Sequence, residues 1–168
     1  MMHRFGPGQI EAAAELLRGG GVLAYPTEAV FGLGCDPDNR VAFDRIFTLK
    51  RRPSEQGVLL VACDFSQIAD WIVAPPEAIE RARATWPGPY TWVFPRSDRV
   101  PEWIAGGHAG IALRVTAHGE VAALCRAFGG PIVSTSANLH GRPPAGTAGE
   151  CEAMFGSALD GILLGETG

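Results

Sequence analysis

A cluster of positive charge lies at residues 50–53, which read Lys-Arg-Arg-Pro. Lysine and arginine together number 14, and Lys50 is the single lysine among them. Because lysine is a compact point charge on a flexible stem and arginine a rigid planar fork, an isolated lysine indicates a position that the fork does not suit. Lys50 and Arg52 are therefore candidate ligands for phosphate oxygens.

Small hydrogen-bonding side chains gather at residues 134–138, directly after the apolar run 131–133. Ser134, Ser136 and Asn138 belong to this segment, and such hydroxyl and amide groups bind phosphate and carboxylate oxygens. Taken singly, the two segments also fit a solvated basic turn and an ordinary Ser/Thr turn. The hypothesis of an anion-binding site depends on finding both together with further matching residues.

Two more polar side chains fit such a site. Thr27 follows an expected strand in a Pro-Thr-Glu turn, where its hydroxyl either faces a ligand or holds the turn together. Arg114 lies on the polar face of the alternating segment 111–116. It is either an exposed face residue or, if that face lines a cleft, a bidentate clamp for a carboxylate.

The sequence supplies cations and hydroxyls but no recognisable covalent nucleophile. It contains no P-loop, no complete dinucleotide fingerprint and no nucleophile elbow. The histidines at 108, 118 and 140 lack metal-ligand spacing, so no structural zinc is expected. Aromatic residues of the 86–92 segment could stack on an adenine, although aromatics in strands usually belong to the core. This set of residues favours phosphoryl or nucleotidyl chemistry, in which positioning and charge neutralisation supply most of the catalysis.

Hydrophobic periodicity and capping signals predict the elements that position these groups. Helices are expected over 8–18, 39–49, 64–72, 75–84, 120–128 and 147–155, and strands over 22–25, 57–62, 111–116, 131–135 and 162–164, with an aromatic-rich strand before residue 95. Helices and strands interleave without strict β-α-β alternation, which predicts a mixed α/β or α+β sheet with helices packed on it. Lys50 and Arg52 then lie at a helix C-terminus, where the macrodipole favours cations even without a ligand.

Composition sets the class of protein. The chain has 168 residues, 46% of them hydrophobic, which is enough for one domain with a substantial core. A net charge of −4 gives no global attraction to nucleic acid or an anionic membrane. A polyanion would therefore have to bind at a local patch of positive charge. The four cysteines lack paired spacing and are expected as free buried thiols. No apolar stretch approaches the ~20 residues of a membrane helix, and a soluble cytoplasmic protein is expected.

Five segments in colinear order resemble the YrdC family. They lie at 25–36, 50–53, 86–89, 112–115 and 134–138, and the similarity extends over nearly the whole chain. The family's defining pair, Lys-x-Arg followed by Ser-x-Asn, is matched by Lys50, Arg52, Ser136 and Asn138. The resemblance implies that residues 1–168 form a single YrdC-like domain, a twisted mixed sheet flanked by helices with a concave, positively charged cleft.

The resemblance also implies an ATP-dependent nucleotidyltransferase. Such an enzyme condenses L-threonine, bicarbonate and ATP into threonylcarbamoyl-AMP and releases diphosphate, with Mg²⁺ carried on the ATP phosphates. A downstream threonylcarbamoyl transferase complex then modifies the adenosine beside the anticodon of tRNA. The residues implied in ATP binding and catalysis are Lys50, Arg52, Ser136 and Asn138. Those implied in threonine binding are Thr27, Arg114 and Ser134, with Arg114 on the carboxylate.

Two departures from the family pattern bear on ATP. Gln56 stands where relatives commonly have lysine or asparagine, and a neutral residue there weakens any phosphate contact. The sequence ends at Gly168, where relatives continue through a Ser/Thr- and Arg-containing segment that closes over the nucleotide, and this departure leaves the ATP affinity open. The alternative function is an RNA-binding module that uses the same basic concavity to hold tRNA or rRNA without catalysis. Direct contact with tRNA is compatible with either function.

Overall fold

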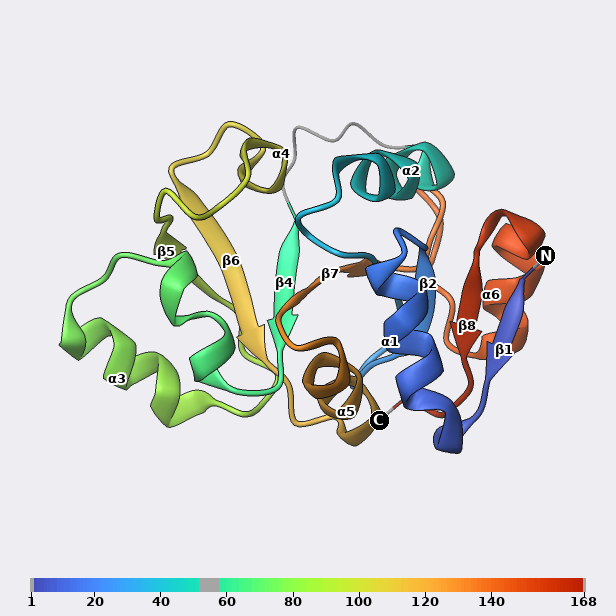
Figure 1. The fold of residues 1–168 in the computed structure, drawn as a ribbon, viewed down its shortest axis with the longest axis horizontal. Coiled ribbons are helices and arrows are strands. Elements are labelled where there is room, and N and C mark those ends of the chain that lie inside the picture. Colours follow the sequence, from blue (N-terminus) through green and yellow to red (C-terminus); the bar gives the residue numbers. More distant parts are fainter. Residues whose placement is uncertain (1, 52–57, 168) are drawn as a thin grey trace.

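The computed structural model describes residues 2–51 and 58–167, which form a mixed sheet with helices on both faces (Figure 1). Within this part of the chain the sheet has eight strands in the order β1-β8-β2-β3-β7-β4-β6-β5. The strands are β1 (His3–Phe5), β2 (Leu23–Pro26), β3 (Phe31–Gly34), β4 (Leu59–Ala62), β5 (Trp92–Pro95), β6 (Gly110–Val115), β7 (Ile132–Ser136) and β8 (Gly161–Leu163). β4 pairs with β6 in parallel and with β7 in antiparallel orientation, which confirms the predicted mixed sheet.

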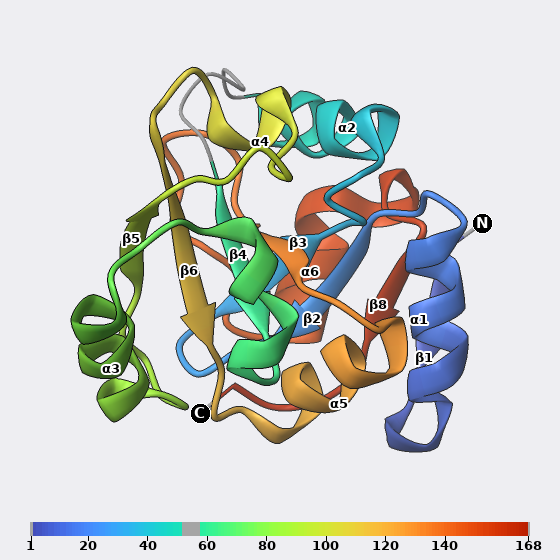
Figure 2. The same cartoon turned by 60° about the vertical axis from the view of Figure 1, so that its left-hand side comes forward.

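The helices cover the two faces of the sheet and bury two apolar clusters. They are α1 (Ile10–Arg18), α2 (Arg40–Lys50), α3 (Pro76–Thr85), α4 (Glu102–Ala105), α5 (Gly119–Phe128) and α6 (Ala148–Phe155). α1 and α5 lie side by side and pack on one face, against Tyr25, Val61 and Ile132 (Figures 1 and 2). α2 and α6 contribute to the cluster that contains Leu60 and Val133, whose side chains alternate to the opposite face.

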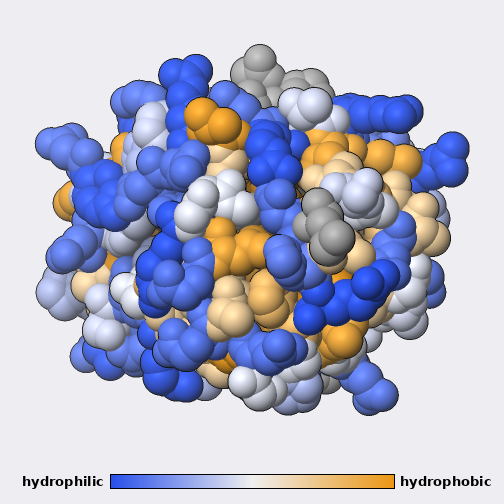
Figure 3. Space-filling model, turned by 45° about the vertical axis from the view of Figure 1, so that its right-hand side comes forward, coloured by the Kyte–Doolittle hydropathy of each residue, from blue (hydrophilic) through white to orange (hydrophobic). Residues whose placement is uncertain are grey.

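The surface is mixed in character. On the face drawn in Figure 3, apolar side chains form small patches that are separated by polar ones. Scattered apolar surface of this kind is ordinary for a globular protein. No helix of the described residues is long and apolar enough to cross a membrane.

The helix caps explain why the predicted helices begin where they do. The Asn39 side chain accepts a hydrogen bond from the Ala42 N–H at 3.0 Å, which starts α2. The Thr147 hydroxyl does the same for the Glu150 N–H at 3.1 Å and starts α6. These two predicted helices are confirmed, because capping is local chemistry that the sequence displays directly.

The helix predicted over 64–72 is wrong. Two short 3₁₀ turns, Phe65–Gln67 and Ala69–Trp71, occupy this segment. The Gln67 side chain bonds the Cys63 N–H and the Cys125 carbonyl, so it fastens the segment to β4 and α5 instead of completing a capping box. Ile72 then bridges to Arg96, which ends any helical continuation.

Strand β3 was not anticipated, because its glycines have low strand propensity. The structure explains the glycines of β3, because neighbouring atoms pack too closely against them to leave room for a side chain. A Cβ on Gly34 would lie 2.6 Å from both the Tyr25 ring and the Val133 carbonyl oxygen. Glycine therefore lets Tyr25 lie across β3 while its hydroxyl donates to the Val133 carbonyl at 3.2 Å. Burial raises the pKa of the Tyr25 phenol well above its ordinary value, so the group stays a donor. β1 and the short helix α4 were also missed, since each is too short to show a period.

Replacing Gly34 with alanine should destabilise the protein. The added methyl group overlaps backbone of β7 and the Tyr25 ring, and overpacking of this kind costs about 1–3 kcal/mol. Urea denaturation measures the change. Gly8→Ala is the matched control, because a Cβ at Gly8 meets nothing within 4 Å. An equal free energy of unfolding for the two variants would contradict the close approach.

The four cysteines are free, as predicted. Cys35, Cys125 and Cys151 are buried, whereas Cys63 is half-buried, so the prediction of burial holds for three of them. Burial raises the pKa of these three buried thiols far above the ordinary value, which keeps them protonated and unreactive.

Candidate active site

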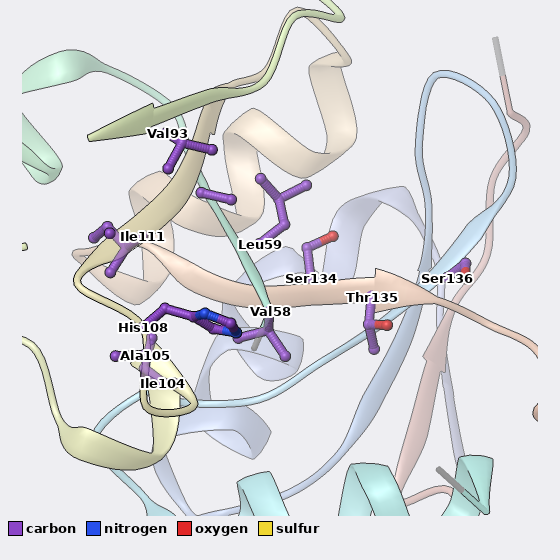
Figure 4. A pocket seen from close by; sticks show the side chains of 12 residues that line it. Val58, Leu59, Val93, Ile104, Ala105, His108, Ile111, Ser134, Thr135 and Ser136 are labelled. Atoms are coloured by element: carbon purple, nitrogen blue, oxygen red, sulfur yellow. The ribbon is translucent and has the colours of Figure 1, made fainter. Parts of the chain in front are cut away.

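Two cavities meet along strand β7. The larger, of about 510 Å³, lies between β7, β4, β6 and the region of α4 (Figure 4). The smaller, of about 190 Å³, lies between β7, the β2–β3 turn and β6. They share the lining residues Leu59, Ser134, Thr135 and Ser136. Ser134 and Thr135 point to opposite sides of β7, as strand alternation requires (Figure 4). A ligand with two chemically different parts could therefore occupy both cavities across one strand.

The small cavity brings together Thr27, Arg114 and Ser134. These residues come from the β2–β3 turn, β6 and β7, and sequence reasoning grouped them as one site. Register explains the meeting, since Val61 of β4 pairs with Arg114 and Leu59 of β4 pairs with Ser134. The Thr27 hydroxyl donates to the Val30 carbonyl at 2.5 Å, so it holds the turn as well as lining the cavity. The turn-holding interpretation of Thr27 is therefore confirmed, and its contact with a ligand stays a prediction.

Arg114 is the cation of the small cavity and is largely buried, with 13% of its side chain exposed. Its Nη2 lies 3.6 Å from Oε1 of Glu28, which is an ion pair but too long for a hydrogen bond. Its Nε has no hydrogen-bond partner in the structure. A buried donor without a partner costs about 1–3 kcal/mol. The guanidinium can therefore accept a further anionic partner, and its fork suits a carboxylate.

Lys50 meets the Ser-x-Asn segment at the end of β7. Its Nζ donates to the Ser136 carbonyl and, at 2.9 Å, to Oδ1 of Asn138. The Ser136 hydroxyl also donates to Asn138 Oδ1, at 2.7 Å. The Asn138 amide donates in turn to the Arg142 carbonyl at 3.0 Å. The predicted meeting of these two distant segments is confirmed, whereas the part played by Arg52 stays a prediction because Arg52 lies outside the described residues.

Lys50 is more buried than a ligand-facing lysine is expected to be. The exposed fraction of Lys50 is 1%. Of Lys50, Ser136 and Asn138, Ser136 is the residue that lines the two cavities. The ammonium thus lies behind the end of β7, close to the Ser136 that lines both cavities. Among the described residues that line the two cavities, Arg114 carries the permanent positive charge. A generally basic cleft stays a prediction.

The large cavity has an apolar wall that sequence reasoning missed. Val58, Val93, Ile104 and Ile111 line it opposite the hydroxyl groups of β7. Val93 is 69% exposed and lies at the edge of the cavity that it lines. A cavity with one apolar and one polar wall suits a ligand that has a flat apolar part and a polar part. The sequence signal for this wall was Val93, an apolar residue at an outward position of the edge strand β5.

Other candidate groups lie elsewhere. Trp86 and Trp92 pack against the main apolar cluster, as their strand context favours, and neither lines the two cavities. The described residues contain no group of three or more histidine, cysteine or acidic side chains that could hold a metal ion.

Comparisons with known proteins identify relatives over nearly the full sequence. The family model Sua5_yciO_yrdC, described as "Telomere recombination", matches residues 15–168. The threonylcarbamoyl-AMP synthase of Stenotrophomonas maltophilia is 52% identical over 162 residues, which cover 95% of this chain and 87% of that protein. The protein of the same name from Halorhodospira halophila is 50% identical over 163 residues, covering 96% of this chain and 85% of that protein.

Solved structures agree with the sequence relatives. The structure of P. abyssi Sua5 complexed with L-threonine has a TM-score of 0.91 and 33% identity, and the match covers 99% of this chain. That match spans 51% of the Sua5 chain, so this chain has about half the length of Sua5. E. coli YciO has a TM-score of 0.88 and 26% identity, with 100% of this chain and 85% of YciO covered.

Proposed function

The chain belongs to the Sua5/YciO/YrdC family, and from that membership we propose that it forms threonylcarbamoyl-AMP from L-threonine, bicarbonate and ATP, with release of diphosphate. Relatives that carry the name of this activity are about 50% identical over most of the chain. The observation that carries the proposal is the small cavity, which joins Thr27, Arg114 and Ser134 in a fold shared with a threonine-bound protein. The comparisons thereby favour an enzyme over an RNA-binding module.

L-Threonine occupies the small cavity in this proposal. Its carboxylate pairs with the Arg114 guanidinium, which has a buried Nε without a partner. Thr27 and Ser134, both largely buried, contribute hydroxyls for the polar groups of the amino acid. The free amine then faces the larger cavity across β7, where Ser134–Ser136 line both spaces.

ATP occupies the large cavity, with its base against the apolar wall and its phosphates toward the Ser136 end of β7. The ammonium of Lys50 lies behind that end and Asn138 is fixed there by Lys50 and Ser136. Arg52, from outside the described residues, is the second cation for the phosphates. Mg²⁺ enters as part of the ATP substrate and neutralises phosphate charge.

The reaction needs positioning and charge neutralisation more than a protein nucleophile. The threonine amine and bicarbonate combine into a carbamate with loss of water. A carbamate oxygen attacks the α-phosphorus, and the bond to diphosphate breaks. This makes the protein an ATP-dependent nucleotidyltransferase. In the cytoplasm a transferase complex passes the threonylcarbamoyl group to the adenosine beside the anticodon of tRNA.

The activity is tested by measuring diphosphate release with each substrate omitted in turn. Diphosphate should appear when ATP, L-threonine and bicarbonate are all present. Serine should react at least about tenfold less efficiently, because it leaves the space of the threonine methyl unfilled. Diphosphate release that is independent of threonine, or salt-sensitive RNA binding without any product, would contradict the proposal.

A further inference from the structure

We propose that Glu28 is a positioning residue for Arg114 and that the Thr116 hydroxyl fixes Glu28. The inference rests on the proposed binding of an amino-acid carboxylate in the small cavity. It concerns two residues behind that cavity, since neither Glu28 nor Thr116 is among its lining residues. Glu28 immediately follows Thr27 in the β2–β3 turn, and Thr116 comes one residue after β6.

The contacts form a chain that ends at Arg114. Thr116 Oγ1 donates to Glu28 Oε1 at 3.1 Å, and the same carboxylate oxygen lies 3.6 Å from Arg114 Nη2. Thr116 is itself fixed, because its hydroxyl accepts from the His118 N–H at 3.0 Å and its own N–H donates to the Ala62 carbonyl at 3.0 Å. Only 2% of Thr116 is exposed, so this support is shielded from water.

Electrostatics explains why a carboxylate stands behind the guanidinium. A largely buried cation needs a nearby countercharge when no ligand is bound. At 3.6 Å, Glu28 supplies that charge without a hydrogen bond and so leaves the guanidinium donors for a ligand. The second oxygen, Glu28 Oε2, is buried and has no hydrogen-bond partner in the structure. A buried acceptor of this kind needs an explanation, and a role as the countercharge of Arg114 supplies one.

The pair also matches the charge of the proposed ligand. Glu28 and Arg114 together are neutral, so a zwitterionic amino acid enters without adding net charge to a buried space. Glu28 therefore supports Arg114 and lowers the attraction of the site for simple anions that lack an ammonium group.

The test is the binding of L-threonine, measured by calorimetry. Glu28→Gln keeps the size of the side chain and an acceptor for Thr116 but removes the charge. We expect about a tenfold higher Kd for L-threonine, because Arg114 without its ion-pair partner is held less firmly toward the carboxylate, and an unchanged Kd for an ATP analogue. At saturating threonine, kcat should change little, so the loss appears in KM.

A double-mutant cycle distinguishes a role through Arg114 from a general structural role. If Glu28 acts by positioning Arg114, Glu28→Gln should have no further effect on threonine binding once Arg114 is replaced by alanine. Glu77→Gln, on the exposed start of α3, makes the same charge change and should leave binding unaltered. Thr116→Val should weaken threonine binding more than Thr116→Ser, which retains the hydroxyl.

The outcomes separate this inference from the proposed function. Failure of the unmodified protein to bind L-threonine would overturn the proposed function. Normal threonine binding by the unmodified protein, together with equal or tighter binding by Glu28→Gln, would overturn the positioning role and leave the proposed function standing. A lower melting temperature for Glu28→Gln with no change in Kd would likewise assign Glu28 to stability alone.

Discussion

Replacing Arg114 with alanine should lower kcat/KM for L-threonine by about 100-fold or more, because the substrate carboxylate loses a largely buried charge partner. The substitution removes both the guanidinium fork and the positive charge, and it leaves Glu28 without its ion-pair partner. Calorimetric titration with L-threonine and measurement of diphosphate release both report the loss. The affinity for an ATP analogue should be nearly unchanged, since Arg114 lines the small cavity and is not among the residues lining the large one.

Two further variants test whether the loss in Arg114→Ala comes from the geometry of the guanidinium or from its charge. Arg114→Lys retains the charge but not the bidentate geometry, so it should recover part of the threonine affinity and not all of it. Arg81→Ala, on the exposed surface of α3, removes one arginine charge from another part of the molecule and should be neutral. Full activity of Arg114→Ala with a normal melting temperature would mean that the carboxylate binds elsewhere.

Replacing Lys50 with methionine should reduce turnover by about 100-fold or more, the cost of removing one group that stabilises transition-state charge. It should also lower the free energy of unfolding by about 1–3 kcal/mol, because the Ser136 carbonyl loses a buried donor. Methionine preserves the unbranched stem, so packing around α2 is disturbed little. Steady-state kinetics at saturating ATP and urea denaturation measure the two effects separately.

Turnover and stability should both fall in Lys50→Met because Lys50 is buried. A lysine that simply reached into solvent to hold phosphate could be removed without loss of stability, whereas this one is 1% exposed and binds the end of β7. Arg40→Met is the matched control, since Arg40 is an exposed cation at the start of the same helix. Turnover of Lys50→Met at the level of this control would show that the ammonium has a purely structural part.

The two substitutions affect different kinetic constants. Arg114 lines the small cavity, where the proposed function places L-threonine, so we expect its loss to appear mainly in KM for threonine. Lys50 lies behind Ser136, where the proposed function places the ATP phosphates, so we expect its loss to appear in kcat. Equal changes in the same constant would argue against two separate subsites along β7.

The local elements were largely predictable from the sequence, because their signals are short-range. α1 and α5 show helical spacing of apolar residues and end at glycines, and β6 alternates strictly between its two faces. The Asn39 cap identified the start of α2. Prediction failed where distant contacts override local preference. Gln67 is used by Cys63 and Cys125 instead of a helix cap, and the glycines of β3 are required by the Tyr25 ring.

The sequence by itself determined which functional groups the site contains. A single lysine, a Ser-x-Asn segment and an arginine on a polar strand face are all visible without coordinates. Local chemistry, such as capping and periodicity, places each of them at the end or on the face of an element. These features sufficed to predict the mixed sheet, and the resemblance of five colinear segments to the YrdC family added the family and the meeting of Lys50 with residues 134–138.

The tertiary structure decided which of those groups touch and which are buried. In the strand order β3-β7-β4-β6 two strands separate β3 from β6, and Glu28 of the β2–β3 turn nevertheless contacts Arg114 and Thr116 from a distant part of the sequence. This arrangement creates the small cavity and places Glu28 and Thr116 behind Arg114. Glu28 and Thr116 are 88 positions apart in the chain. It also buries Lys50 against β7. Strand neighbours are selected by packing over the whole sheet, so the local sequence carries no signal for these contacts.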